Sequence, residues 1–171
     1  LNNLAYLYSE MGNYTDALTL YQEALGIFET TLGHNHPLVA TSLNNIAGEY
    51  LNAGDNVMAL PLFKEALKID RNIYGENHPA YAVGLLNLNT FYQEAGNYFL
   101  ALPLVEQAVA IYKNVLGPDH PSYAAGLQSL AVLHYRLGEY QVALPLLEEA
   151  LAVEKARLGN YHPTYAVSLN N

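Results

Sequence analysis

The chain has 171 residues, 51% of them hydrophobic, and a formal net charge of −9 with only seven Lys plus Arg. This size and apolar content exclude a disordered chain and predict a folded protein with a sizeable core. Because nucleic acids and anionic membranes attract clustered basic residues, the acidic composition excludes both as expected partners.

The first residues, LNNLAYLYSEMG, lack the basic region and the cleavage site of a signal peptide. They also lack an initiator Met, so we expect the chain to be a fragment of a longer protein. The chain contains no Cys, which excludes disulfides and thiolate chemistry and suits the reducing cytoplasm. We therefore expect a cytoplasmic protein. No apolar run in the sequence is long enough to be expected to span a bilayer.

Local signals divide the rest of the chain into pairs of helices. Pro37 suits the first turn of a helix, and Leu43 and Ile46 lie on one helical face. Gly54 is typical of a left-handed helix end, and Asp55 can cap the helix that follows. Apolar residues at helical spacing then continue to the next glycine. The predicted helices lie near 37–53 and 56–74.

The same pattern recurs every 42 residues along the whole chain. The recurring positions include two glycines and a His-Pro pair, at Gly12, Gly54, Gly96 and Gly138, at Gly33, Gly75, Gly117 and Gly159, and at His36, His78, His120 and His162. Residues 1–171 are therefore predicted to be one all-α array of four periods plus three residues. The other predicted first helices lie near 79–95 and 121–137, the other second helices near 14–32, 98–116 and 140–158, and partial first helices at 1–11 and 163–171.

Two features do not fit a regular helix pair. Pro61, with its equivalents Pro103 and Pro145, lies inside the second helix, where we expect the helix to continue with a bend. Asn89 stands where the other periods have Ala. A buried amide needs partners, so Asn89 is either satisfied locally or marks a feature specific to its own helix.

The first period, LNNLAYLYSEMGNYTDALTLYQEAL, resembles the tetratricopeptide repeat. The resemblance runs through Leu4-Ala5, Tyr8, Gly12, Tyr14, Ala17, Tyr21 and Ala24-Leu25. The longer period, with LGHNHP between repeats and ALPL in the second helix, is similar to the kinesin light chain subtype. This resemblance implies a right-handed superhelical solenoid of stacked antiparallel helix pairs. It also implies that first helices line a concave groove, in which extended peptides or partner helices lie.

Helical geometry predicts which side chains face this groove. Asn3, Asn45 and Asn87 occupy one position of the repeat, and their amides can pair with the backbone of an extended peptide. The alternative is that they bond within the array or to water. The full set of candidate groove residues is Asn3, Asn44, Asn45, Asn87, Thr90, Gln128, Tyr135 and Arg136.

The charge of the predicted groove indicates what it binds. Arg136 is its only cation, against Glu10 and Glu94. The groove therefore carries more negative than positive charge and would repel an acidic peptide. We expect a neutral or basic protein partner instead. Tight, salt-sensitive binding of an acidic peptide would contradict this expectation.

No motif predicts catalysis, a cofactor or a metal. The His-Pro histidines recur once per period, so helix packing would hold them about 8–10 Å or more apart, too far to share a zinc ion. We expect them to be structural turn residues. Asp119, His120 and Ser122 are neighbours in sequence, which rarely gives the geometry of a catalytic triad.

The sequence therefore predicts a non-enzymatic protein-interaction scaffold. One alternative, suggested by similar repeats in signalling proteins, is a sensor array that controls an attached NTPase or caspase-like protease domain. Another is a structural unit that stacks head-to-tail through Leu1–Met11 and Pro163–Asn171, since repeat arrays without polar end caps expose apolar ends.

Overall fold

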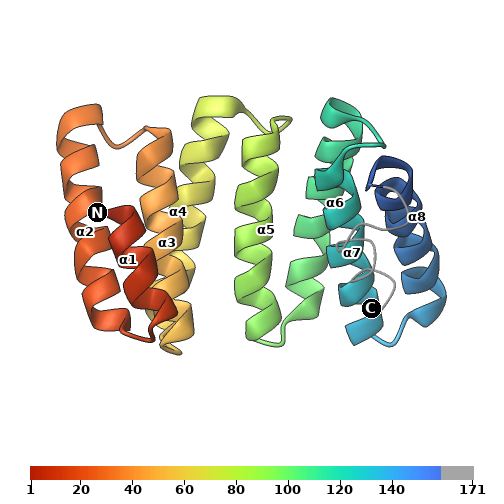
Figure 1. Ribbon diagram of the computed structural model, residues 1–171, viewed down its shortest axis with the longest axis horizontal. Helices are drawn as coiled ribbons and strands as arrows, with labels where there is room; N and C mark the ends of the chain where they lie inside the picture. Colours follow the sequence, from red (N-terminus) through yellow and green to blue (C-terminus); the bar gives the residue numbers. More distant parts are fainter. Residues whose placement is uncertain (159–171) are drawn as a thin grey trace. The chain divides into compact units, whose positions relative to one another are not determined.

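A computed structural model describes residues 1–158 of the chain, and these residues form eight helices and no strand (Figure 1). The first helices of the repeats are α1 (Asn2–Glu10), α3 (Pro37–Asn52), α5 (Pro79–Glu94) and α7 (Pro121–Arg136). The second helices are α2 (Tyr14–Leu32), α4 (Asn56–Tyr74), α6 (Tyr98–Leu116) and α8 (Tyr140–Leu158). The partial helix predicted over 163–171 lies outside the described residues.

The helices α3 and α4 begin and end at residues whose chemistry suits those places. Pro37 opens α3, and the Asp55 carboxylate accepts a hydrogen bond from the Met58 backbone N–H at 3.1 Å as the N-cap of α4. Gly54 and Gly75 have φ angles of 79° and 78°, a conformation that side chains with a Cβ rarely adopt. The predicted helix ends at these glycines are confirmed.

The helices α4, α6 and α8 pass through Pro61, Pro103 and Pro145 without a break. In α4 the proline is the sixth residue. It has no N–H to donate to the carbonyl of Val57, four residues earlier in the first turn of the helix. Val57 is exposed to solvent. The prediction that the helix continues is confirmed. The predicted bend stays a prediction.

The chain forms two compact units, Leu1–Glu76 and the residues from Asn77 on. In the first unit α2 packs against both α1 and α3, and α4 packs against α3. Small residues on the second helices allow these close contacts, since Ala17 and Ala59 are fully buried. One core cluster joins Ala5 of α1 and Tyr21 of α2 to Ile46 of α3.

In the second unit α6 packs against α5 and α7, and α8 packs against α7. Val105, Ile111 and Tyr112 bury their side chains on α6. By length and composition alone, α6 could cross a membrane, which the sequence patterning did not indicate. Its buried residues contact neighbouring helices, as in the core of a helical repeat protein, and the absence of a membrane partner stays a prediction.

Candidate interaction surfaces

The first unit carries three of the predicted groove residues, on α1 and α3. Asn3 is exposed and Asn45 is half-buried, and neither side-chain amide has a hydrogen-bond partner among residues 1–158. Asn44 is also half-buried, but its Oδ1 atom is shielded from solvent and lacks a partner there. The two amides of Asn3 and Asn45 are therefore free to bind a ligand, whereas the Asn44 oxygen faces the interior.

The second unit carries the other five, on α5 and α7. Asn87 is half-buried and its amide is unpaired within the described part of the chain. The Thr90 hydroxyl donates to the Leu86 carbonyl of its own helix at 3.1 Å. Gln128 donates its amide to Glu154 Oε1 on α8 at 2.9 Å. Much of the hydrogen-bonding capacity of Thr90 and Gln128 is thus used inside the fold.

The C-terminal end of α7 presents the remaining two groove residues to solvent. Tyr135 is exposed, and its ring meets that of Tyr140 edge-on, with 5.4 Å between the ring centroids. Arg136 is exposed and makes no ion pair with any described residue. Nearby, His134 Nδ1 lies 2.6 Å from Glu139 Oε2. This end of the helix therefore offers an aromatic face beside a free positive charge.

Buried polar residues beside the predicted groove were not recognised in the sequence. Ser42 and Glu49 are buried on α3, and Ser42 Oγ and Glu49 Oε2 have no partner among residues 1–158. Burial and the negative charge of Glu49 raise the pKa of Tyr21 above its usual value. The helical wheel alone could not reveal these positions, because α3 is covered on one side by α2 and on another by α4.

A contact between three helices of the second unit joins Tyr123, Glu149 and Lys113. The Tyr123 hydroxyl of α7 donates to Glu149 Oε1 of α8 at 2.7 Å. Lys113 of α6 lies over the Tyr123 ring, 5.5 Å from its centroid. Burial, followed by the hydrogen bond to Glu149, raises the pKa of Tyr123. Glu149 is exposed, yet its carboxylate links α7 to α8.

Asn89 is satisfied locally. It is buried on α5, and its Oδ1 atom accepts a hydrogen bond from Gln93 Nε2, one turn along the same helix, at 2.9 Å. The amide therefore needs no ligand and no partner helix to offset its burial. Of the two interpretations of this position, the structure supports the local one.

The His-Pro histidines cap the first helices. The Nδ1 atoms of His36, His78 and His120 accept hydrogen bonds from the backbone N–H two residues later, at 3.2, 3.1 and 3.1 Å. The predicted structural role is confirmed for these three, and His162 lies outside the described residues. Among residues 1–158, no group of three or more His, Asp or Glu could hold a metal ion.

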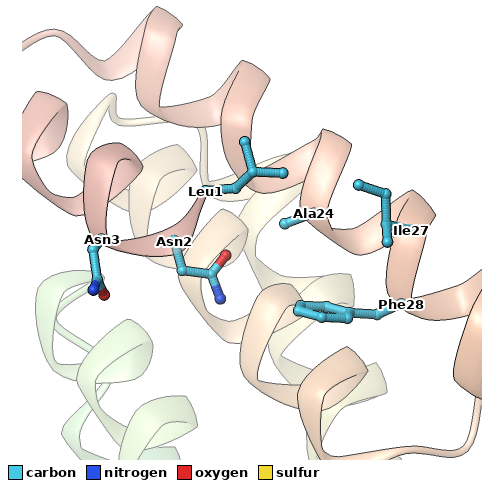
Figure 2. A pocket seen from close by; sticks show the side chains of 6 residues that line it. All are labelled: Leu1, Asn2, Asn3, Ala24, Ile27 and Phe28. Atoms are coloured by element: carbon cyan, nitrogen blue, oxygen red, sulfur yellow. The ribbon is translucent and has the colours of Figure 1, made fainter.

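A pocket of about 420 Å³ opens between the start of α1 and the C-terminal half of α2 (Figure 2). Its apolar wall comes from Leu1, Ala24, Ile27 and Phe28, and Asn2 points toward the Phe28 ring. The Asn2 Oδ1 atom is buried without a partner in the described part of the chain. None of these pocket residues was among the candidate groove residues predicted from the sequence except the neighbouring Asn3, which also lines the pocket.

A second pocket, of about 410 Å³, lies between the loop after α2 and the outer side of α4. Its lining residues are polar or charged except Ile69, and they include Lys64, Lys68 and Glu65. His34 Nδ1 is 3.0 Å from Glu29 Oε1. The positive and negative side chains of the lining are all exposed to water. This pocket therefore shows no preference for a ligand of one charge.

Comparison with known proteins identifies the fold class. A tetratricopeptide repeat family model matches residues 1–72 and 85–156. The chain therefore belongs to the tetratricopeptide repeat family, and its class is an all-α helical repeat solenoid. A search of curated protein sequences finds no match.

Solved structures narrow the class to the kinesin light chain-like type. A putative kinesin light chain with nearly identical TPR-like repeats from Podosopora anserina is 29% identical, with a TM-score of 0.82 over 98% of this chain and 79% of that chain. BtubC (BKLC) from P. vanneervenii is 25% identical, with a TM-score of 0.81 over 95% of this chain and 64% of that chain. Aspartyl phosphate phosphatase F from Bacillus subtilis is 17% identical, with a TM-score of 0.81 over 99% of this chain and 42% of that chain. At this identity the match shows the fold alone.

Proposed function

We infer that the chain is a scaffold that binds segments of partner proteins along its first helices. Tetratricopeptide repeat proteins generally mediate protein–protein interactions, and the kinesin light chain-like type is a non-catalytic scaffold. The observation that carries the proposal is the repeated amide at one position of the first helix. Asn3, Asn45 and Asn87 keep both the donor and the acceptor of that amide unpaired within the described residues.

An unpaired amide at a helix surface favours recognition of a peptide backbone. It offers a donor and an acceptor to any extended segment, whatever the side chains of that segment. Side chains would then be selected by neighbouring residues, such as the exposed Tyr135 ring and the Arg136 guanidinium in the second unit. The polar contacts of Thr90 and Gln128 within the fold hold this surface in place.

The partner is a neutral or basic segment. The net charge of −9 creates a field that attracts cations and slows the approach of acidic peptides. The exposed carboxylates of Glu10 and Glu94 lie on first helices, against the single cation Arg136. No feature of residues 1–158 favours the alternative role as a sensor array for an attached NTPase or protease.

The test is selection from a random peptide display library, followed by affinity measurement with the selected peptide. Asn45→Ala plus Asn87→Ala should weaken binding by about tenfold or more, since each amide loses two hydrogen bonds to the ligand. Asn114→Ala, at an exposed position of α6, is the matched control and should leave the affinity unchanged. Equal affinity of the double variant and the wild type would refute a role for these amides. Selection of acidic peptides would refute the charge preference.

A further inference from the structure

Glu49 of α3 is a buried carboxylate at a position where the other repeats place apolar side chains. It is 5% exposed, and its Oε2 atom has no hydrogen-bond partner among residues 1–158. The equivalent residues of the other described first helices are Leu7, Phe91 and Leu133. A buried charge without a partner destabilises a folded protein. The packing of the repeat therefore does not account for a carboxylate at this position.

No Lys or Arg of the first unit pairs with Glu49. The helices α1, α2 and α3 contain neither residue type, and the three cations of residues 1–76 all lie on α4. Lys64 and Lys68 line the pocket on the outer side of α4. Arg71 pairs with Glu76 at 2.6 Å. The described residues therefore leave the negative charge of Glu49 unpaired.

The surroundings of Glu49 are acidic. Burial, then the charge of Glu49 and then Tyr6 of α1, raise the pKa of Tyr21 on α2. Glu49 therefore lies where α3 meets α1 and α2. A hydrogen bond to Glu10, an exposed residue of α1, raises the pKa of Tyr6. Two carboxylates thus lie around these tyrosines, with no cation on the three helices to balance them.

The surface of α3 beside Glu49 is open. A Cβ on Gly48 would meet no atom within 4 Å. The other described first helices carry side chains at this position of the repeat: Tyr6, Thr90 and Val132. Asn45 precedes Gly48 by three residues and Glu49 by four, so the three are neighbours on the helix surface. The unpaired amide of Asn45 therefore lies one turn from an unpaired carboxylate.

We propose that Glu49 binds a cationic side chain of a peptide, which approaches over Gly48 while the Asn45 amide binds the peptide backbone. This site rests on the peptide-binding function proposed above and adds the side chain that it selects. Arginine fits best, because its planar guanidinium pairs with both oxygens of a carboxylate. The bound cation supplies the partner that Glu49 lacks in the free chain, so part of the cost of burying the carboxylate is recovered on binding.

The experiment is a nuclear magnetic resonance titration of the isotope-labelled full chain with the short peptide acetyl-Gly-Arg-Gly-amide, up to about 10 mM. The backbone amide signals of Gly48 and Glu49 should shift. The same peptide with citrulline, which is neutral and has nearly the shape of arginine, should bind about tenfold more weakly or not at all. Glu49→Gln should bind both peptides equally weakly. Glu94→Gln, at an exposed carboxylate of α5, is the matched control and should behave as the wild type.

The variant Glu49→Leu separates binding from folding. Since other periods have Leu at this position, it should unfold at the same or a higher urea concentration than the wild type and lose the arginine-dependent shifts. A lower unfolding midpoint would overturn the proposal, because the carboxylate would then serve the fold. Absence of shifts at Gly48 and Glu49, or equal shifts in Glu49→Gln, would also overturn it. Peptides from the display selection that lose affinity in Asn45→Ala plus Asn87→Ala but not in Glu49→Gln would refute this site alone and leave the peptide-binding function intact.

Discussion

Asp70 on α4 offers a sharp test of the packing in the first unit. Its side chain is 8% exposed, and burial raises the pKa of its carboxyl from 3.8 to about 6. The corresponding residues in two other periods are the aromatic Phe28 and Tyr112. The position therefore tolerates apolar side chains, and a buried carboxylate there is expected to destabilise the folded chain at neutral pH.

The sign and the size of this effect follow from the two pKa values. Below pH 3.8 the Asp70 carboxyl is protonated in both the folded and the unfolded chain, so it costs nothing. As the pH rises toward 6, the unfolded chain releases this proton first, and the folded state loses stability. A difference of roughly two pKa units corresponds to about 3 kcal/mol, at about 1.4 kcal/mol per unit. We expect Asp70→Asn to raise the free energy of unfolding at pH 7 by up to this amount.

The packing register predicts a hydrogen-bond partner for an amide at this position. Gln128 and Glu154, which are hydrogen-bonded, are 26 residues apart on paired helices, and Asn44 and Asp70 have the same separation. The Asn44 Oδ1 atom is buried and lacks a donor among residues 1–158. If the 26-residue register holds here, we expect the side-chain N–H introduced by Asp70→Asn to donate to Asn44 Oδ1.

Urea unfolding followed by circular dichroism between about pH 3.5 and 7.5 measures the effect, as the difference in free energy between the two proteins. Taking this difference cancels the titration of the other carboxylates. It should fall from its maximum near neutral pH to nearly zero at the acid end. Asp119→Asn, in an exposed loop, is the control and should show a small difference at every pH. A constant difference for Asp70→Asn across the range would refute the assignment of the raised pKa.

Three further substitutions test local features of the fold. A Cβ on Gly126 would lie 3.0 Å from a Val109 methyl carbon, so Gly126→Ala should lower the free energy of unfolding by about 1–2 kcal/mol. Gly48→Ala, where a Cβ meets nothing within 4 Å, should not lower it, and equal losses would contradict the close packing. His120→Ala removes a helix N-cap and should cost about 1 kcal/mol in thermal or urea unfolding, whereas His120→Asn should retain most of that stability. Asn89→Ala should change the free energy of unfolding by less than about 1 kcal/mol, because Ala fills this place in the other periods. A loss above about 2 kcal/mol in urea unfolding would show that the amide does more than bond locally.

The helix boundaries could be predicted because each is set by residues close to it in sequence. Gly54 and Gly75 end helices through a backbone conformation that favours glycine, and Asp55 and His78 cap the helices that follow. These signals act within a few residues, and the 42-residue period repeats them along the chain. The apolar spacing then determines which face of each helix is buried. The fold class therefore followed from the sequence, and the family match confirmed it.

The contacts between helices could not be predicted in the same way, because they depend on how one helix is positioned along another. The hydrogen bonds from Tyr123 to Glu149 and from Gln128 to Glu154 each join residues 26 apart, and neither pair is marked by a local pattern. Once this separation is known, the repeat extends it to other periods. Figure 2 shows that Asn2 points toward the ring of Phe28, which is also 26 residues away in sequence, although no hydrogen bond joins this pair. Only the structure could therefore show which predicted groove residues form hydrogen bonds within a helix pair and which do not.

The exposure of Ile27 shows a further limit of repeat-based reasoning. Ile27 and Ile69 occupy the same position of the period and lie in similar sequence, yet one is half exposed and the other is buried. A period predicts what each residue contacts only where its neighbouring repeat is present to provide the contact. In the first unit, Val39 and Ala40 provide that contact for Ile69, and no described residue provides it for Ile27. The environment of a repeat residue is therefore a property of two adjacent periods, and the repeat pattern of one period alone does not predict it.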